Sequence, residues 1–290
     1  MTTLKITHNA GILSCYSKRL EGIVWFFNAY KYLPDRVDSS EQFSLYKSNP
    51  SEDITSLYIK EIPKEHRNIR PVVFYNDMQF LDYRGIDFAR LDPFIALYFT
   101  PSDHVASIVS LYEKKYAIEY KNTCAVFYRG NDKSTETTIA SYESFISQAR
   151  KIKEQFSDVL FLVQTDETEF LELFEKEFPG AVHFEEVPHI RKQQSTVHDE
   201  LPLEERAEFG ARFLAATLVL SKCEHLITHS GNCGLWAVLY RGNSNGVYQW
   251  LNGSWGRSWI ERLYLWIKIQ YKKTLRKIIK GNIGWKVVAE

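Results

Sequence analysis

Two kinds of apolar pattern alternate along the second half of the chain. Runs of consecutive apolar residues are typical of buried parallel strands, and apolar residues at every third or fourth position are typical of amphipathic helices. The runs predict strands at residues 124–128, 159–163, 181–184, 225–228 and 246–250. The helical spacing predicts helices at residues 142–156, 167–178, 203–221 and 232–240. Because strands and helices alternate, we expect an α/β protein with a parallel sheet covered by helices on both faces.

The first half of the chain has a less regular pattern. It predicts strands at residues 4–7, 56–59 and 71–75, and helices at residues 15–32 and 103–116. Ser102 or Asp103 would cap the second of these helices. The polar break just before this helix suggests a domain boundary. We therefore expect one lobe at residues 1–105, a second at residues 106–256, and a cleft between them.

Composition narrows the class of protein. Of the 290 residues, 44% are hydrophobic, which is ordinary for a folded protein and excludes a disordered one. The 36 basic residues balance 36 acidic ones, so a generally basic nucleic-acid-binding protein is excluded. The sequence starts without the apolar segment of a secretory signal, and its best apolar run, residues 213–220, is too short to cross a bilayer. Four scattered cysteines favour a reduced, cytoplasmic protein with buried thiols.

The balanced total conceals one strongly basic segment. Residues 257–280 contain eight basic residues and one acidic residue, a net charge of +7. Apolar residues recur in this segment at three- and four-residue steps, which predicts an amphipathic helix. We favour a C-terminal helix, within residues 257–290, that crosses back to pack on the first lobe. The alternative is a helix that contacts an anionic membrane.

The loop after the strand at residues 124–128 carries the first candidate site. In open α/β sheets, ligands bind beyond the carboxyl ends of the strands. Arg129 and Lys133 lie there, and both cations are suited to a diphosphate. Asp132 would orient them, and Glu136 adds a carboxylate close to both. A solvated charged turn explains this loop about equally well when it is considered alone.

Two further loops follow neighbouring strands. Ser230, Gly231 and Asn232 begin a helix, where backbone N–H groups and the helix dipole favour an anion. An ordinary helix cap is the alternative. Together with the Arg129 loop, this helix start predicts a diphosphate site without a metal ion. Thr165 and Asp166 are assigned first to capping the next helix, with nucleotide contact as the less favoured role.

Residues of the first half could face the same cleft. His8, Asn9 and Gly11 lie in the turn between the first strand and the first helix, and Asp77 follows the strand predicted at residues 71–75. A purely structural role as turn residues is favoured for all of them.

Metal, hydrolase and dinucleotide motifs are missing from the sequence. It contains no Asp-x-Asp pair, no Gly-x-Ser-x-Gly elbow, and no Gly-x-Gly-x-x-Gly fingerprint after a strand. His225 and His229 would lie about 13 Å apart along a strand. His183, His189 and His198 lack the spacing of a zinc site.

Three blocks of sequence resemble the α-1,6-fucosyltransferases and the related nodulation fucosyltransferases. They are VFYRGNDKSTE at residues 126–136, LFLVQTDETEFLELFEKEFP at residues 160–179, and LVLSKCEHLITHSGNCGLWAVL at residues 218–239. Their order and spacing match that superfamily, and residues 98–116 resemble its lobe-linking helix. The start of the chain, residues 11–43, also resembles glycosyltransferase-like proteins of giant algal viruses.

The resemblance implies a GT-B fold, with two Rossmann-like lobes and the donor nucleotide sugar on the C-terminal lobe. The N-terminal lobe would then lie on the acceptor side. Arg129 would hold the donor diphosphate from one side, and Ser230, Gly231 and Asn232 from the other. Lys133 and Glu136 would serve the reacting centre, although the family's base lies one residue further along than Glu136.

The family's two guanine-reading residues correspond to Phe127 and Ala216 in this chain. Neither side chain can make those hydrogen bonds, so UDP-linked donors, UDP-xylose among them, become candidates beside GDP-linked ones.

We therefore expect an inverting glycosyltransferase that transfers a fucose- or xylose-like sugar to a hydroxyl group of a glycan. Cationic side chains would neutralise the leaving diphosphate, so neither a metal nor another cofactor is predicted, and the donor is a substrate. Glu136 is the first candidate base, and Asp38 or Asp77 is the second. The alternative is a non-catalytic module that binds a nucleotide sugar or a glycan on the same fold.

Overall fold

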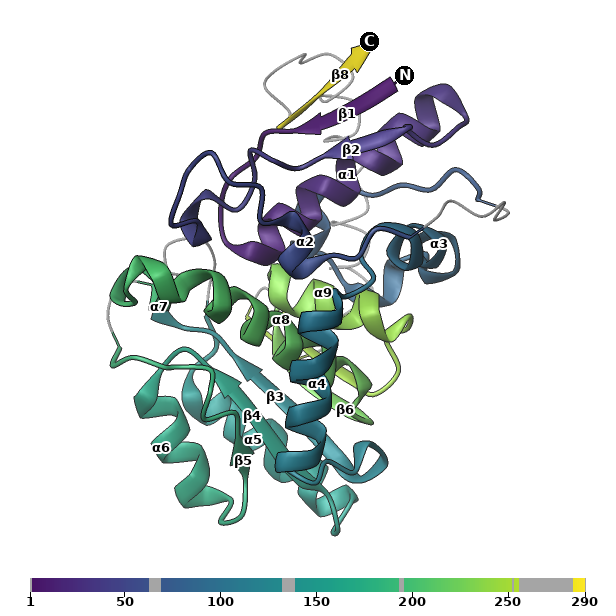
Figure 1. The fold of residues 1–290 in the computed structure, drawn as a ribbon. Coiled ribbons are helices and arrows are strands. Elements are labelled where there is room, and N and C mark those ends of the chain that lie inside the picture. Colours follow the sequence, from purple (N-terminus) through teal and green to yellow (C-terminus); the bar gives the residue numbers. More distant parts are fainter. Residues whose placement is uncertain are drawn as a thin grey trace.

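The second half of the chain is built around a five-stranded parallel sheet (Figure 1). The computed structural model describes residues 2–62, 69–131, 139–192, 196–251, 253–255 and 284–289. In spatial order the strands are β5 (Val182–His183), β4 (Leu160–Thr165), β3 (Thr123–Tyr128), β6 (His225–His229) and β7 (Val247–Trp250). All neighbouring strands run parallel. The parallel sheet predicted from the apolar runs is confirmed.

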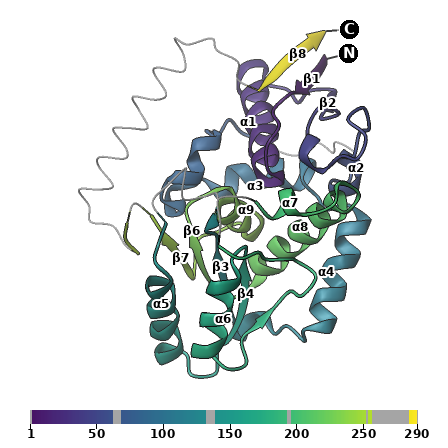
Figure 2. The same ribbon diagram turned by 90° about the vertical axis from the view of Figure 1, so that its left-hand side faces the viewer.

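Helices cover both faces of this sheet, as Figure 2 shows from the side. On one face lie α5 (Tyr142–Gln155) and α6 (Thr168–Glu177), and on the other lies α8 (Arg206–Lys222). The central strand β3 is buried at all six positions. Its side chains alternate between the two faces, so Val126 packs with α5 and α6, whereas Ala125 packs with α8. Burial on both faces explains why its sequence is continuously apolar.

The first half contributes a smaller sheet and a long helix. Strand β1 (Thr2–Ile6) pairs in parallel with β2 (Arg36–Asp38) and antiparallel with β8 (Trp285–Ala289). Helix α1 (Ile12–Tyr30) follows β1. Helix α3 (Phe88–Tyr98) and helix α4 (Asp103–Lys115) lead into the larger sheet. The Ser102 side chain accepts a hydrogen bond from the Val105 N–H group, which confirms the predicted cap of α4.

Two strands predicted in the first half are wrong. Residues 56–59 fall mostly in a short helix, α2 (Thr55–Tyr58). Residues 71–75 show the expected alternation, with Val72 5% exposed and Val73 50% exposed, but they join no sheet. Their backbone is instead held by the Asn28 side chain, which donates to the Val72 carbonyl at 2.6 Å. The alternation reports burial on one side and carries no information about the hydrogen-bonding partner.

The end of the chain departs from the predicted helix at residues 257–290. Trp285–Ala289 form strand β8 beside β1. Trp285 packs against α1 at Gly22, where an added Cβ would meet its ring at 3.3 Å. The basic segment at residues 257–280, and with it the predicted membrane contact, lies outside the described residues. Within the described ranges, no helix has both the length and the apolar character needed to cross a membrane.

A continuous core joins the two halves. Helix α9 (Asn232–Arg241) places Trp236 against Tyr16 of α1 and Phe99, with ring centroids 5.1 and 4.7 Å apart. The Ser17 hydroxyl accepts from the Trp236 indole N–H at 2.9 Å and donates to the Asn232 side-chain oxygen at 2.6 Å. One cluster of buried hydrophobic residues has members on both sides of residues 105 and 106. The predicted division of the chain into two lobes at this point therefore stays a prediction.

Candidate functional site

A cavity of about 510 Å³ lies at the carboxyl ends of β3, β4 and β6. Residues of the first half, from the start of α1 and from residues 76–80, form part of its lining. This is the position that ligands occupy in open α/β sheets. The structure brings eight of the predicted site residues to the cavity: Gly11, Asp77, Arg129, Thr165, Asp166, Ser230, Gly231 and Asn232.

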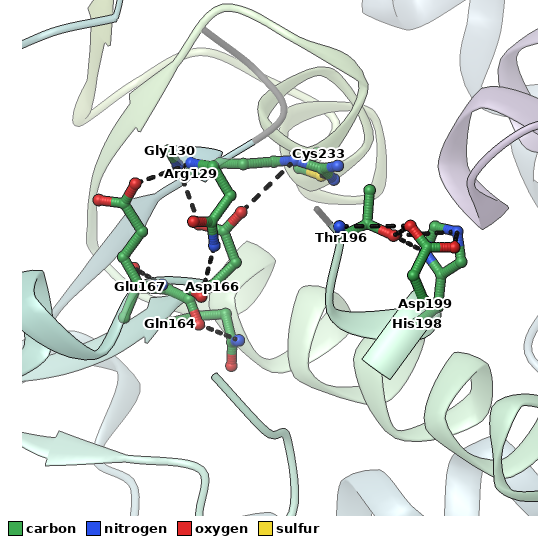
Figure 3. A network of polar contacts seen from close by, with 11 residues as sticks. Arg129, Gly130, Gln164, Asp166, Glu167, Thr196, His198, Asp199 and Cys233 are labelled. Atoms are coloured by element: carbon green, nitrogen blue, oxygen red, sulfur yellow. Dashed lines mark hydrogen bonds and ion pairs between the residues drawn. The ribbon is translucent and has the colours of Figure 1, made fainter. Parts of the chain in front are cut away.

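Arg129 follows the last residue of β3 and reaches across the cavity lining (Figure 3). Its Nε lies 4.0 Å from a carboxylate oxygen of Asp166, and its Nη1 lies 3.9 Å from the Cys233 sulfur. The Arg129 side chain is 31% exposed, so a ligand in the cavity can reach the guanidinium. Strand β3 therefore places the Arg129 guanidinium at the carboxyl end of the sheet, where the sequence predicts a cation.

Two acidic residues after β4 hold the loop after β3. The other oxygen of the Asp166 carboxylate accepts from the Gly130 N–H group at 2.9 Å, and Glu167 accepts from the Asn131 N–H group at 2.7 Å. Glu167 is fully buried and also accepts from the Tyr142 hydroxyl at 2.5 Å. A Cβ atom at Gly130 would lie 2.0 Å from the Glu167 carboxylate, so a larger residue there would require the carboxylate or the loop to move.

The predicted cap of α6 is therefore wrong. Glu167 is the residue at the cap position, and no side chain caps the helix. The Asp166 carboxylate instead accepts from the Gly130 N–H group and lies beside the Arg129 guanidinium. The Thr165 hydroxyl accepts from the Glu167 N–H group at 3.1 Å. Local sequence suggested a cap because Asp and Thr are common there, but the partners of Asp166 lie 36 residues earlier in the chain.

The start of α9 lines the cavity through Asn232, Cys233 and Gly234. The first backbone N–H groups of a helix have no partner within it, and the helix dipole adds positive potential there. Ser230 and Gly231 just before the helix have structural partners: the Ser230 hydroxyl donates to the Trp250 carbonyl at 2.9 Å, and the Gly231 N–H donates to the Gln79 carbonyl at 2.9 Å. The first backbone N–H groups of α9 are therefore better placed to bind an anion than the Ser230 hydroxyl or the Gly231 N–H group.

The two candidate carboxylates of the first half, Asp77 and Asp38, lie in different places. Asp77 lines the cavity. Asp38 ends β2 beside Lys5, away from the cavity, and accepts from the Ser40 N–H group at 2.9 Å. Burial acts to raise the pKa of Asp38, but the Ser40 hydrogen bonds and the charges of Arg36 and Lys5 bring it below the ordinary value. Asp38 is not among the residues that line the cavity, so its role as the base stays a prediction.

The turn after β1 behaves mainly as a connector. Asn9 bridges to residues 41–44, donating to the Glu41 carbonyl at 2.6 Å and accepting from the Ser44 N–H group at 3.0 Å. His8 contacts the Ser14 hydroxyl at 3.0 Å, and burial together with Lys18 lowers its pKa. His8 and Asn9 lie outside the cavity lining, whereas Gly11 belongs to it as the residue before α1.

The other three predicted site residues, Asp132, Lys133 and Glu136, lie outside the described residues. Their roles stay predictions.

His198 lines the cavity and was considered in the sequence only as a zinc ligand. It lies in the short helix α7 (Val197–Glu200), near Thr196 and Asp199 and opposite Arg129 (Figure 3). The Thr196 hydroxyl lies 2.9 Å from His198 Nδ1 and donates to Asp199 at 2.6 Å. The preceding loop has no strand or helical period, so the sequence had no signal that would place it here. Among the described residues, no group of three or more His, Cys, Asp or Glu side chains is placed to hold a metal ion.

The fold matches solved structures, whereas no family model and no curated protein sequence matches the chain. NodZ α-1,6-fucosyltransferase soaked with GDP-fucose has a TM-score of 0.53 and 12% sequence identity, covering 81% of this chain and 91% of that chain. Fucosyltransferase NodZ from Bradyrhizobium has a TM-score of 0.52 at 12% identity, over 80% and 91% of the two chains. NodZ co-crystallized with GDP has a TM-score of 0.52 at 12% identity, over 81% and 91%.

These similarities establish the fold. The chain has the α/β GT-B architecture of these fucosyltransferases, as the resemblance in sequence implied. The resemblance of residues 11–43 to algal viral proteins gains no support from them.

Proposed function

We propose that this chain is an inverting, metal-independent glycosyltransferase. It transfers a fucose- or xylose-like sugar from a GDP- or UDP-linked donor to a hydroxyl group of a glycan. One observation carries the proposal: Arg129, the start of α9 and Asp77 line a single cavity at the carboxyl ends of the sheet. The same fold in a fucosyltransferase soaked with GDP-fucose supports the choice of donor class.

The chemistry follows from where charge develops. As the bond between the anomeric carbon and the diphosphate breaks, negative charge grows on the leaving oxygen. The Arg129 guanidinium and the first N–H groups of α9 stabilise that charge. The acceptor oxygen attacks the anomeric carbon from the opposite side, which inverts its configuration, and a carboxylate removes the acceptor proton. Residues 1–105 would hold the acceptor and residues 106–256 the donor.

Two carboxylates are candidates for this base. Asp77 is the described candidate from the first half, because it lines the cavity. Glu136 remains the candidate from the loop after β3, with Lys133 beside the reacting centre.

Replacing Arg129 tests the proposal. Arg129→Ala should lower kcat/KM for transfer by about 10²–10³-fold, because a donor to the developing charge is lost. Glu136→Gln and Asp77→Asn identify the base, since only the true base should abolish transfer when neutralised. Arg150→Ala is the matched control, because that arginine lies on the outer surface of α5 in ion pairs with Glu143 and Glu177. Full activity of both Arg129→Ala and Glu136→Gln, measured with a panel of nucleotide sugars, would contradict the assignment.

Product analysis separates a glycosyltransferase from a module that only binds the nucleotide sugar. A non-catalytic module would bind the nucleotide sugar through Arg129 but neither transfer nor hydrolyse it. Product analysis after long incubation with GDP-, UDP- and dTDP-sugars therefore distinguishes the two.

A further inference from the structure

Two amides of the first half line the cavity next to the start of α9. Asn76 and Gln79 belong to a short 3₁₀ helix, η2 (Asn76–Phe80). A 3₁₀ helix has three residues per turn, so residues three apart lie on the same face. Both amides therefore lie on the face of η2 that meets the cavity. The Gln79 carbonyl also accepts from the Gly231 N–H group at 2.9 Å, which holds η2 against the residue before α9.

The side-chain oxygens of these two amides are buried without a partner. Gln79 is only 4% exposed, and neither its Oε1 nor the Asn76 Oδ1 has a hydrogen-bond donor among the described residues. Buried polar atoms nearly always have a partner, so two orphaned oxygens beside one cavity indicate that a ligand supplies the donors. An amide oxygen can only accept a hydrogen bond. The ligand must therefore present O–H or N–H groups to this face of η2.

The start of α9 has the opposite polarity. An indole N–H group can only donate, so the Ser17 hydroxyl accepts from Trp236 at 2.9 Å and gives its one hydrogen to the Asn232 side chain at 2.6 Å. The Asn232 atom that faces Ser17 is therefore its oxygen, and its amino group remains for the cavity that Asn232 lines. Together with Arg129 and the first N–H groups of α9, this part of the cavity presents donors, which suit phosphate oxygens.

We propose that Asn76 and Gln79 form a subsite that binds hydroxyl groups of the sugar carried by the donor. The proposal rests on the proposed function and adds the residues that recognise the sugar. An ionised diphosphate has no hydrogen-bond donor, whereas the sugar attached to it has several hydroxyl groups. With the diphosphate at the start of α9, that sugar lies beside η2, because Gln79 contacts Gly231 there. Asp77, a candidate base on the same turn, is then next to the sugar.

Calorimetric titration of the full chain compares each nucleotide sugar with its own diphosphate: GDP-fucose with GDP, and UDP-xylose with UDP. Gln79→Met keeps the length of the side chain and removes its oxygen. We expect it to weaken binding of the nucleotide sugar by about 5- to 100-fold and to change binding of the diphosphate by less than about twofold. Equal weakening of both ligands, or of neither, would overturn the proposal while leaving the proposed glycosyltransferase standing. Wild-type binding of a diphosphate but of neither nucleotide sugar would also overturn it. If none of the four ligands binds, the proposed function itself fails.

Gln148→Met is the matched control, because Gln148 of α5 is 7% exposed and lies outside the cavity lining. It should change neither affinity. Asn76→Ala should weaken the nucleotide sugar selectively, as Gln79→Met does, and it decides the test if thermal melts show that Gln79→Met does not fold.

Deoxy analogues of the sugar identify the contact as a hydroxyl group. The analogue that lacks the contacted hydroxyl should bind the wild-type protein and Gln79→Met equally, because the variant has no further contact to lose. If every analogue in the series keeps the full difference between the two proteins, Gln79 does not bind a sugar hydroxyl and the proposal is refuted.

Discussion

At the scale of single residues, the loop after β3 depends on carboxylates that come from the loop after β4. Arg129 could be placed from the sequence, because a residue that directly follows a buried strand must lie at the edge of the sheet. The roles of Asp166 and Glu167 could not, because their partners are backbone N–H groups 36 residues away. Asp38 lies at the end of β2, a strand that the apolar pattern did not predict, so its position outside the cavity lining could not be predicted either.

Gly130→Ala tests this arrangement. The added methyl group would lie 2.0 Å from the Glu167 carboxylate, so the loop or the carboxylate must move. We expect the free energy of unfolding to fall by about 1–3 kcal/mol, the usual cost of overpacking. Urea denaturation measures it.

Gly85→Ala is the matched control, since its added methyl group meets nothing within 4 Å. We expect a change within about 0.5 kcal/mol there. Equal effects of the two substitutions would argue against the role of the Glu167 contact.

At the scale of elements, the start of α9 is fixed by a segment of the first half. The Tyr83 hydroxyl lies within hydrogen-bonding distance of both backbone groups of Gly231, donating to its carbonyl at 3.0 Å and accepting from its N–H group at 3.2 Å. Gln249 of β7 completes the arrangement, accepting from the Tyr83 N–H group at 3.0 Å. The orientation of the helix dipole toward the cavity thus depends on residues from both halves.

Tyr83→Phe removes only the hydroxyl group. We expect it to lower the free energy of unfolding by about 1–3 kcal/mol, because buried backbone groups of Gly231 lose a partner. It should also weaken the binding of nucleoside diphosphates, which calorimetry measures. Tyr30→Phe is the control, since Tyr30 is 46% exposed. Unchanged nucleotide affinity in a destabilised Tyr83→Phe variant would separate this contact from ligand binding.

Elements of the second half were predictable and several of the first half were not. The central strands β3 and β4 are largely apolar runs set between helices, so the apolar pattern marks them. Residues 71–75 alternate like a strand because Val72 and Phe74 are buried, yet a side chain of α1 replaces the neighbouring strand. Helix α3 was missed because Pro93 lies inside it, where proline usually argues against a helix.

At the scale of the whole molecule, three histidines in separate parts of the chain make stability depend on pH. Burial lowers the pKa of His8, His189 and His225 below the ordinary value of 6.5. The unfolded chain therefore takes up protons at higher pH than the folded protein does. The stability contributed by these groups is fully present above about pH 6.5 and is lost as the pH falls through the folded pKa values.

Denaturation curves at pH 7.5, 6.5 and 5.5 test this expectation. The free energy of unfolding should decline over that interval. His225→Phe should flatten the decline, because the imidazole at the start of β6 is buried, with Glu224 raising its pKa and Arg241 lowering it. An unchanged slope in this variant would remove His225 from the explanation.

The pairing of β1 with β8 also governs how the molecule can assemble. Thr2 lies opposite Ala289, so this antiparallel pair closes a loop that contains almost the whole chain. Loop-closure entropy makes such a contact slow to form, whereas βαβ units of the larger sheet can form locally. Strand β1 precedes the larger sheet along the chain, and its partner β8 follows that sheet. We therefore expect the contact between β1 and β8 to form after the larger sheet has folded.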